Sequence, residues 1–133
     1  MKRFNAVSGI NGKLRKLIED AYNLRLRLSE LRASRFSQEH MIMLREQDIE
    51  KVKAMAYLTV IENPENRMAS EQERQSRVIC ALIEEKLYRS ALTSISRGRL
   101  KINRFNAEIA VLEAGIKKME SEEQMLFIEI GKQ

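Results

Sequence analysis

The sequence predicts an all-α protein, built as a long antiparallel helical hairpin or coiled coil that forms oligomers. A heptad repeat of mainly apolar residues runs from Tyr88 to Ile130. Charged residues make up 32% of the 133 residues and aromatic residues only 5%. This composition is typical of long helices with one solvent-exposed face. The single proline, Pro64, lies near the middle of the chain. We therefore expect one helical domain over residues 1–133, folded about that proline.

Residues 1–12 are predicted to form an N-terminal loop. Ser8, Gly9, Asn11 and Gly12 are residue types common in loops, and Asn11 can cap a helix. The basic start is not followed by the apolar core of a secretory signal. The longest apolar run, Ala54 to Ile61, is far shorter than the ~20 residues that span a bilayer. We expect no membrane association and a soluble, cytoplasmic protein.

Residues 13–62 are predicted to form the first helical arm. Its apolar residues are spaced three and four apart, but continuing this register places polar residues such as Arg35 and Gln38 on the packing face. Either the helix continues to Glu62, with one possible kink near residues 34–37, or these residues form a joint and Ser37 caps a second helix. The absence of glycine and proline from that stretch favours the continuous or gently kinked helix. The apolar positions are Leu14, Leu17, Ala21, Leu24, Leu28 and Leu31.

Residues 63–69 are predicted to form the turn, and residues 70–130 the second helical arm. Pro64 disfavours helical geometry at Asn63, and Ser70 with Glu73 matches a capping box that starts the next helix. A phase shift of the apolar pattern occurs near Lys86. Gly98 interrupts the heptads at a cost of ~1 kcal/mol relative to alanine. We define the packing seam, which is also the expected oligomer seam, as Ile95, Ile102, Phe105, Ile109, Leu112, Ile116 and Met119.

Several apolar residues fall outside the heptad positions of both arms. They include Met41, Met43, Tyr57 and Val60. Two facing helices cannot bury this surplus, so we expect a homo-oligomer or a helical protein partner.

The residue types needed for catalysis are scarce. His40 is the only histidine and Cys80 the only cysteine, so one chain cannot assemble a zinc cluster or a Ser-His-Asp triad. Cys80 lies in an apolar helical stretch and is predicted to be a buried structural thiol. We expect a protein that is not an enzyme and has no cofactor.

Positive charge is concentrated in two stretches of the sequence. The chain carries 24 basic and 19 acidic side chains, and residues 1–35 hold nine of the former against three of the latter. Residues 97–104 add four cations and no acid. Folding about Pro64 and Glu65 would bring Arg97 level with Arg32. The resulting band could bind nucleic-acid phosphates, or its members could be solvated or paired with acids. The band consists of Arg25, Arg27, Arg32, Arg97, Arg99, Lys101 and Arg104.

The second half of the chain resembles short helical coiled-coil proteins encoded in phage and prophage recombination or replication gene clusters. In these proteins an Asn-Glu-x-x-Arg element opens a helix that carries a later tyrosine and ends in a charged coiled coil. The nearest equivalents here are Asn66, Glu73, Arg74, Arg77 and Tyr88, with a longer spacing from the asparagine to the arginine. The resemblance implies an accessory role in DNA metabolism.

These observations lead to three functional hypotheses. The first is a non-enzymatic coiled-coil interaction or scaffold protein that binds a protein partner and self-associates. The second is a basic nucleic-acid-binding accessory factor in phage-type DNA recombination or replication. The third is a small inhibitor or regulatory subunit of a larger complex.

Overall fold

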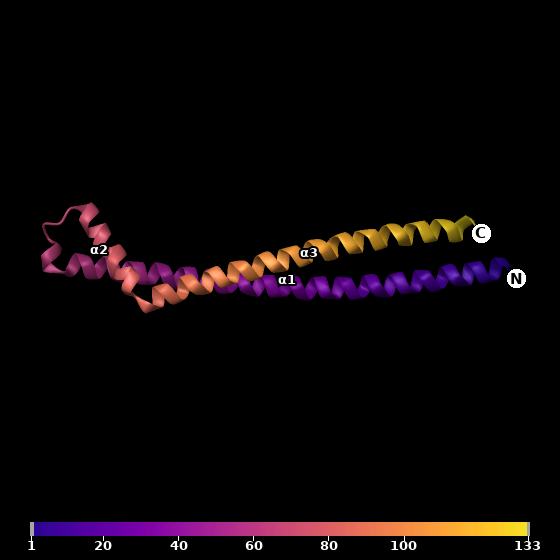
Figure 1. The fold of residues 1–133 in the computed structure, drawn as a ribbon, viewed down its shortest axis with the longest axis horizontal. Coiled ribbons are helices and arrows are strands. Elements are labelled where there is room, and N and C mark those ends of the chain that lie inside the picture. Colours follow the sequence, from indigo (N-terminus) through magenta and orange to yellow (C-terminus); the bar gives the residue numbers. More distant parts are fainter. Residues whose placement is uncertain (1, 133) are drawn as a thin grey trace. The chain divides into compact units, whose positions relative to one another are not determined.

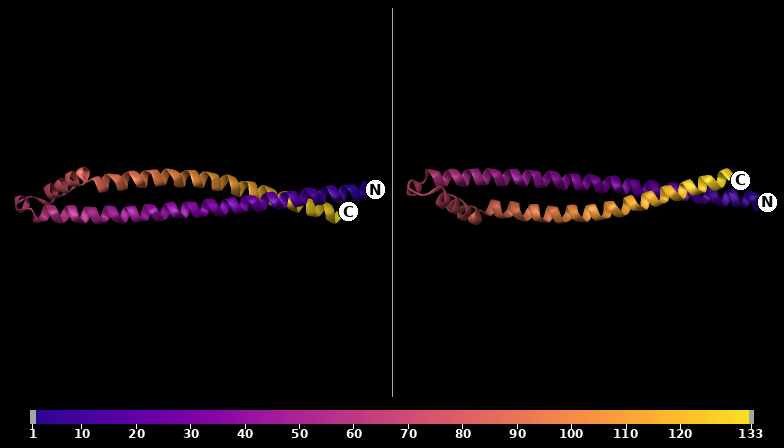
Figure 2. Two further views of the ribbon diagram at one scale, coloured as in Figure 1. Left: turned by 90° about the horizontal axis from the view of Figure 1, so that it is seen from below. Right: turned by 90° about the horizontal axis from the view of Figure 1, so that it is seen from above.

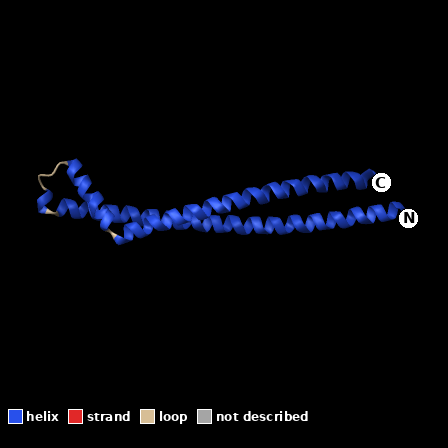
Figure 3. Ribbon diagram, viewed as in Figure 1, coloured by secondary structure: helices blue, strands red, loops and turns tan. Residues whose placement is uncertain are grey.

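The computed structural model describes residues 2–132, and the side chains of residues 9–132. It contains the long helices α1 (Lys2–Glu62) and α3 (Lys86–Lys132) and the shorter helix α2 (Glu71–Glu84) (Figures 1 and 3). A 3-10 helix, η1 (Pro64–Asn66), lies between α1 and α2. The described residues form no strand, and α1 packs against α3, so the predicted all-α helical hairpin is confirmed.

The packing contacts divide the chain into two compact units. Unit 1 combines Met1–Arg35 with Asn103–Gln133, of which the terminal residues 1 and 133 are not described. Unit 2 is the continuous segment Phe36–Ile102. Within each unit a segment of α1 lies alongside a segment of α3 (Figure 2). The single domain expected over residues 1–133 thus consists of two separately packed parts.

The core of unit 1 joins the beginning and the end of the chain. Leu28 and Leu31 from α1 are buried against Ile109 and Ile116 from α3. Half-buried apolar side chains border this cluster on both helices. They are Leu24, Phe105 and Leu112.

The core of unit 2 repeats this arrangement with smaller side chains. Ile42 and Ile49 of α1 are buried against Ala91 and Ile95 of α3. The half-buried side chains of Met41, Tyr88 and Ile102 pack against this cluster. Among residues 9–132 no large side chain is less than 2% exposed, because so few packed helices cannot enclose one.

The heptad positions of α3 coincide with its buried and half-buried residues. Every position of the repeat from Tyr88 to Ile130 belongs to one of these two classes, including Gly98 and Glu123. A β-carbon added to Gly98 would lie 3.0 Å from Cγ1 of Ile42. The missing side chain therefore allows α1 and α3 to approach closely in unit 2.

The beginning of the chain differs from the prediction. The loop expected over residues 1–12 is wrong from residue 2 onward, because α1 already starts at Lys2. Gly9 and Gly12 each cost ~1 kcal/mol in a helix but do not forbid it. Helix α1 also runs without interruption through residues 34–37, so the alternative of a joint with a second helix capped by Ser37 is wrong.

The turn is held by hydrogen bonds that centre on Asn66, the one buried polar residue among those described. Its side-chain Nδ2 donates to the carbonyl oxygen of Val60 over 2.8 Å. Nε of Arg74 donates to the carbonyl oxygen of Asn66 over 3.4 Å. Ser70 caps α2 by accepting a hydrogen bond from the backbone N–H of Glu73 over 3.2 Å, which is the serine half of the predicted capping box. Asn66 and Arg74 therefore stabilise the turn.

The second arm is not one helix. Glu85 adopts an extended backbone conformation (φ −75°, ψ 117°) between α2 and α3. Leu82 is buried and Tyr88 is half-buried, yet in a continuous helix residues six positions apart would point about 120° away from each other. The break lets both helices turn their apolar residues inward. It lies at the phase shift that the sequence shows near Lys86.

Candidate interaction surfaces

An ion-pair ladder crosses from α1 to α3 along one side of unit 1. Arg32 Nη2 lies 2.9 Å from Glu113 Oε1, and Arg25 Nη2 lies 3.0 Å from Glu120 Oε1. The two arginines are seven residues apart, as are the two glutamates, so they occupy the same position in successive heptads. About half of each side chain is exposed, so each pair contributes ~0.2–1 kcal/mol at most.

Unit 2 contains one pair of the same kind with the charges exchanged between the helices. Glu46 of α1 accepts a hydrogen bond from Arg99 of α3 over 3.5 Å. Glu46 lies two heptads beyond Arg32, and Arg99 two heptads before Glu113. These pairs define the antiparallel register of each unit.

The observed register differs from the expected one. Arg32 lies opposite Glu113, so the expectation that Arg97 comes level with Arg32 is wrong. The expectation assumed a tight turn at Pro64 and Glu65. Instead, residues 63–70 and the separate helix α2 come between α1 and α3, so a given point on α1 meets a residue later in the sequence.

The seven cations of the predicted basic band fall in both units and differ in their partners. In unit 1, Arg27 lies 3.6 Å from both Glu30 and Glu108, in addition to the pairs of Arg25 and Arg32. In unit 2, Arg99 is paired with Glu46. Four of the seven charges are thus partly neutralised within the chain. Three have no ion pair with any residue between 9 and 132. They are Arg104 in unit 1 and Arg97 and Lys101 in unit 2.

Large apolar side chains are exposed on both units, and most of them on unit 2. Twenty are exposed in the described part of the chain, against twelve buried apolar residues. Thirteen of the twenty belong to unit 2. The seven in unit 1 are Ile18, Tyr22, Leu26, Val111, Met125, Phe127 and Ile128.

A groove of about 310 Å³ lies beside the α2–α3 break, and we call it the unit 2 groove. Met55 and Leu87, which are 68% and 53% exposed, contribute to its walls. Met43, Leu58 and Ile83 are further exposed apolar side chains of this unit. The groove is lined by Val52, Met55, Ala56, Thr59, Ala81, Glu85 and Leu87.

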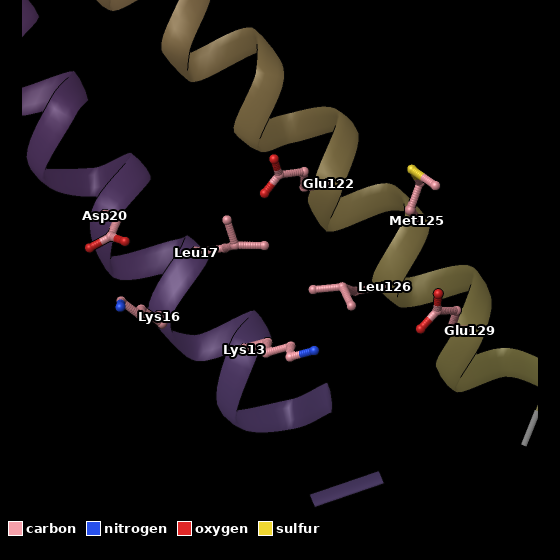
Figure 4. A pocket seen from close by; sticks show the side chains of 8 residues that line it. All are labelled: Lys13, Lys16, Leu17, Asp20, Glu122, Met125, Leu126 and Glu129. Atoms are coloured by element: carbon pink, nitrogen blue, oxygen red, sulfur yellow. The ribbon is translucent and has the colours of Figure 1, made fainter. Parts of the chain in front are cut away.

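A second groove, of about 430 Å³, lies between α1 and α3 in unit 1, and we call it the unit 1 groove. Figure 4 shows Leu17 and Leu126 facing each other across it. Lysines line its α1 side and glutamates its α3 side. The full lining is Lys13, Lys16, Leu17, Asp20, Glu122, Met125, Leu126 and Glu129.

Three further observations concern chemistry. In the described part of the chain, no three histidine, cysteine or acidic side chains are grouped so that they could hold a metal ion. No described helix has a stretch long and apolar enough to cross a membrane. Cys80 is exposed on α2, so its predicted burial is wrong. Leu82, two residues later, occupies the inward-facing position instead.

Comparison of the chain with known protein families, curated proteins and solved structures finds no match. The resemblance to phage-encoded coiled-coil proteins, and the nucleic-acid role that it implies, therefore stay predictions.

Neither groove could be located from the sequence, because each depends on the helix register. One signal did exist for the unit 2 groove. The phase shift near Lys86 marks the break beside which it lies, and the surplus of apolar residues between Met43 and Ile61 lies in the helix that forms one wall.

Proposed function

We propose that this chain is a non-enzymatic interaction or scaffold protein that self-associates and binds an amphipathic helix of a protein partner on unit 2. The observation that carries the proposal is the exposure of thirteen large apolar side chains on a unit of 67 residues, Phe36–Ile102. Contiguous exposed apolar surface is typical of sites where another protein binds, and on unit 2 Met55 and Leu87 lie together in one groove.

The shape and lining of the unit 2 groove support a helical ligand. Its lining comes from α1, α2 and α3 and is mainly apolar, with Thr59 and Glu85 as the polar members. An amphipathic helix fills such a groove with side chains at positions i, i+3, i+4 and i+7. Burying one exposed methionine or leucine in such a contact contributes ~1.5–3 kcal/mol. Met55, Leu87 and their neighbours therefore offer several anchor points. An inhibitor or regulatory subunit of a larger complex would use the same surface.

Site-specific photo-crosslinking tests this proposal. A photoreactive residue placed at Met55 should form a defined product with a partner in cells that express the chain. The matched control is the same residue at Glu50, which lies outside the unit 2 groove, about 140° around α1 from Met55, and is 76% exposed in its side chain. Equal products from both positions, or none from Met55, would contradict the proposal.

A nucleic-acid-binding accessory role, of the kind found in phage-type recombination or replication, is the second candidate. It is supported by the cations that form no ion pair within the described part of the chain, which are Arg104 in unit 1 and Arg97 and Lys101 in unit 2. Unpaired cations bind phosphates without first breaking an internal contact. The paired state of the other four cations favours the protein-binding function.

A further inference from the structure

The unit 1 groove has two walls of opposite charge. Lys13 and Lys16 lie on the α1 wall, and Glu122 and Glu129 on the α3 wall. Asp20 is the one exception, an acid on the α1 wall. Neither lysine forms an ion pair with any residue between 9 and 132. The charges of the groove are therefore available to a binding partner.

The floor of the groove is apolar and incompletely covered. Leu17 and Leu126 are only half-buried, and Met125 is 64% exposed. Elsewhere in unit 1, outside this groove, Val111 of α3 is 71% exposed and lines a separate, smaller pocket with Leu112. A partner that fits this surface must offer apolar side chains in the centre and both signs of charge at the edges.

We propose that the occupant of the unit 1 groove is the same groove of a second copy of the chain. Two copies related by a two-fold axis parallel to α1 and α3 would form a four-helix bundle from their unit 1 segments. In this arrangement α1 of each copy lies over α3 of the other, and every neighbouring pair of helices is antiparallel.

The register of unit 1 brings opposite charges together in this bundle. Arg25 lies opposite Glu120, so Lys16, nine residues earlier, is level with Glu129, nine residues later. A rotation about an axis parallel to the helices does not change the position of a residue along that axis. Lys16 of one copy is therefore level with Glu129 of the other copy as well. The lysine wall of one copy then faces the glutamate wall of the other, twice in each dimer.

The alternative two-fold axis, perpendicular to the helices, lacks this match. It would place α1 over α1 and α3 over α3, so lysines would face lysines and glutamates would face glutamates. Like charges placed against each other oppose association. Charge complementarity therefore selects the parallel axis.

The inference rests on the proposed self-association and adds the surface and symmetry that produce it. Sedimentation equilibrium of the full chain measures the monomer–dimer dissociation constant. We expect the double variant K13E/K16E to weaken the dimer about 100-fold, because both walls of each groove are then negative. The double variant E122K/E129K should weaken it to a similar degree, because both walls are then positive.

Mixing the two variants provides the decisive measurement. In a mixed dimer the lysine walls of E122K/E129K face the glutamate walls of K13E/K16E. The reversed walls also face each other with opposite charges. An equimolar mixture should therefore dimerise about as tightly as the native chain. If the charges acted only within one chain, mixing would restore nothing.

The outcomes separate this inference from the proposed function. A native chain that stays monomeric at high concentration would contradict both self-association and the dimer through the unit 1 groove. A native oligomer that neither double variant weakens would overturn the groove inference alone. Circular dichroism of each variant shows whether its helices are still folded. Met125→Glu is a second probe of the same surface. It should weaken the dimer by placing a charge in the apolar part of the groove, while Lys13 and Lys16 stay unchanged.

Discussion

Gly98 of α3 lies so close to Ile42 of α1 that a β-carbon would stand 3.0 Å from Cγ1 and 3.1 Å from Cδ1 of the isoleucine. We expect Gly98→Leu to separate the helices and lower the free energy of unfolding by ~1–3 kcal/mol, the usual cost of overpacking. Urea denaturation followed by circular dichroism measures the change.

Gly115 provides the matched control on the same helix. Its added β-carbon would lie 3.7 Å from Cδ1 of Leu24, an ordinary contact distance. Gly115→Ala should raise the free energy of unfolding by ~0.5–1 kcal/mol, through helix propensity alone. An unchanged stability for Gly98→Leu would show that the two helices are not in close contact at this point.

Asn66 should be the most sensitive residue of the turn. Asn66→Ala removes the donor to the carbonyl oxygen of Val60 and leaves a cavity beside a buried polar group. We expect the free energy of unfolding to fall by ~1–3 kcal/mol in chemical denaturation. Asn103→Ala, at an exposed asparagine on α3, is the control and should change stability by less than ~0.5 kcal/mol. Equal effects of both substitutions would show that Asn66 does not stabilise the turn.

Ile109 should be essential for unit 1. It is 5% exposed in the core, so Ile109→Asp would bury a carboxylate among Leu28, Leu31 and Ile116. We expect a loss of at least ~3 kcal/mol in the free energy of unfolding. Hydrogen exchange of α3 peptides should rise first in unit 1. Val111→Asp, two residues away and 71% exposed, should leave exchange in the unit 1 core unchanged. Similar exchange in both variants would contradict the packing of α3 on α1.

Nucleic-acid binding by the predicted basic band should involve few phosphates. Three cations of the predicted band have no ion pair with a residue that the structure describes. Three phosphate contacts predict an affinity for duplex DNA that falls about 40-fold between about 50 and 200 mM salt. Fluorescence anisotropy of labelled single- and double-stranded oligonucleotides measures this dependence. A much steeper fall would show that the paired arginines also bind phosphate. Absence of binding at both salt concentrations would contradict the proposed nucleic-acid-binding role.

The sequence predicted the helices and their inward faces well. Heptad spacing depends only on the period of the α-helix, so it located the inward-facing residues of α3 from Tyr88 to Ile130. The same register extends along α1 through the polar positions Arg35 and Gln38, both half-buried. Local capping chemistry likewise identified Ser70 as the start of α2.

Long-range register could not be predicted in the same way. An antiparallel pair of heptad repeats can slide by seven residues with its apolar faces still matched, so the pattern does not say which residues meet. The extended conformation of Glu85 and the length of the connection decide this, and neither has a strong local signal. The interaction surfaces depend on that register, so they could not be predicted from the sequence either.

The division of the chain into two units has a consequence for the order of folding. Unit 2 is one continuous segment, whereas Arg25 and Glu120 of unit 1 are separated by 95 residues. Joining distant segments costs more loop-closure entropy than joining near ones, unless the intervening chain is already folded. We therefore expect the central hairpin to form first and to shorten the effective loop for the ends. During synthesis the amino-terminal third of α1 has no packing partner until the last residues of α3 have been made. Until then the leucines of this segment are exposed to other chains.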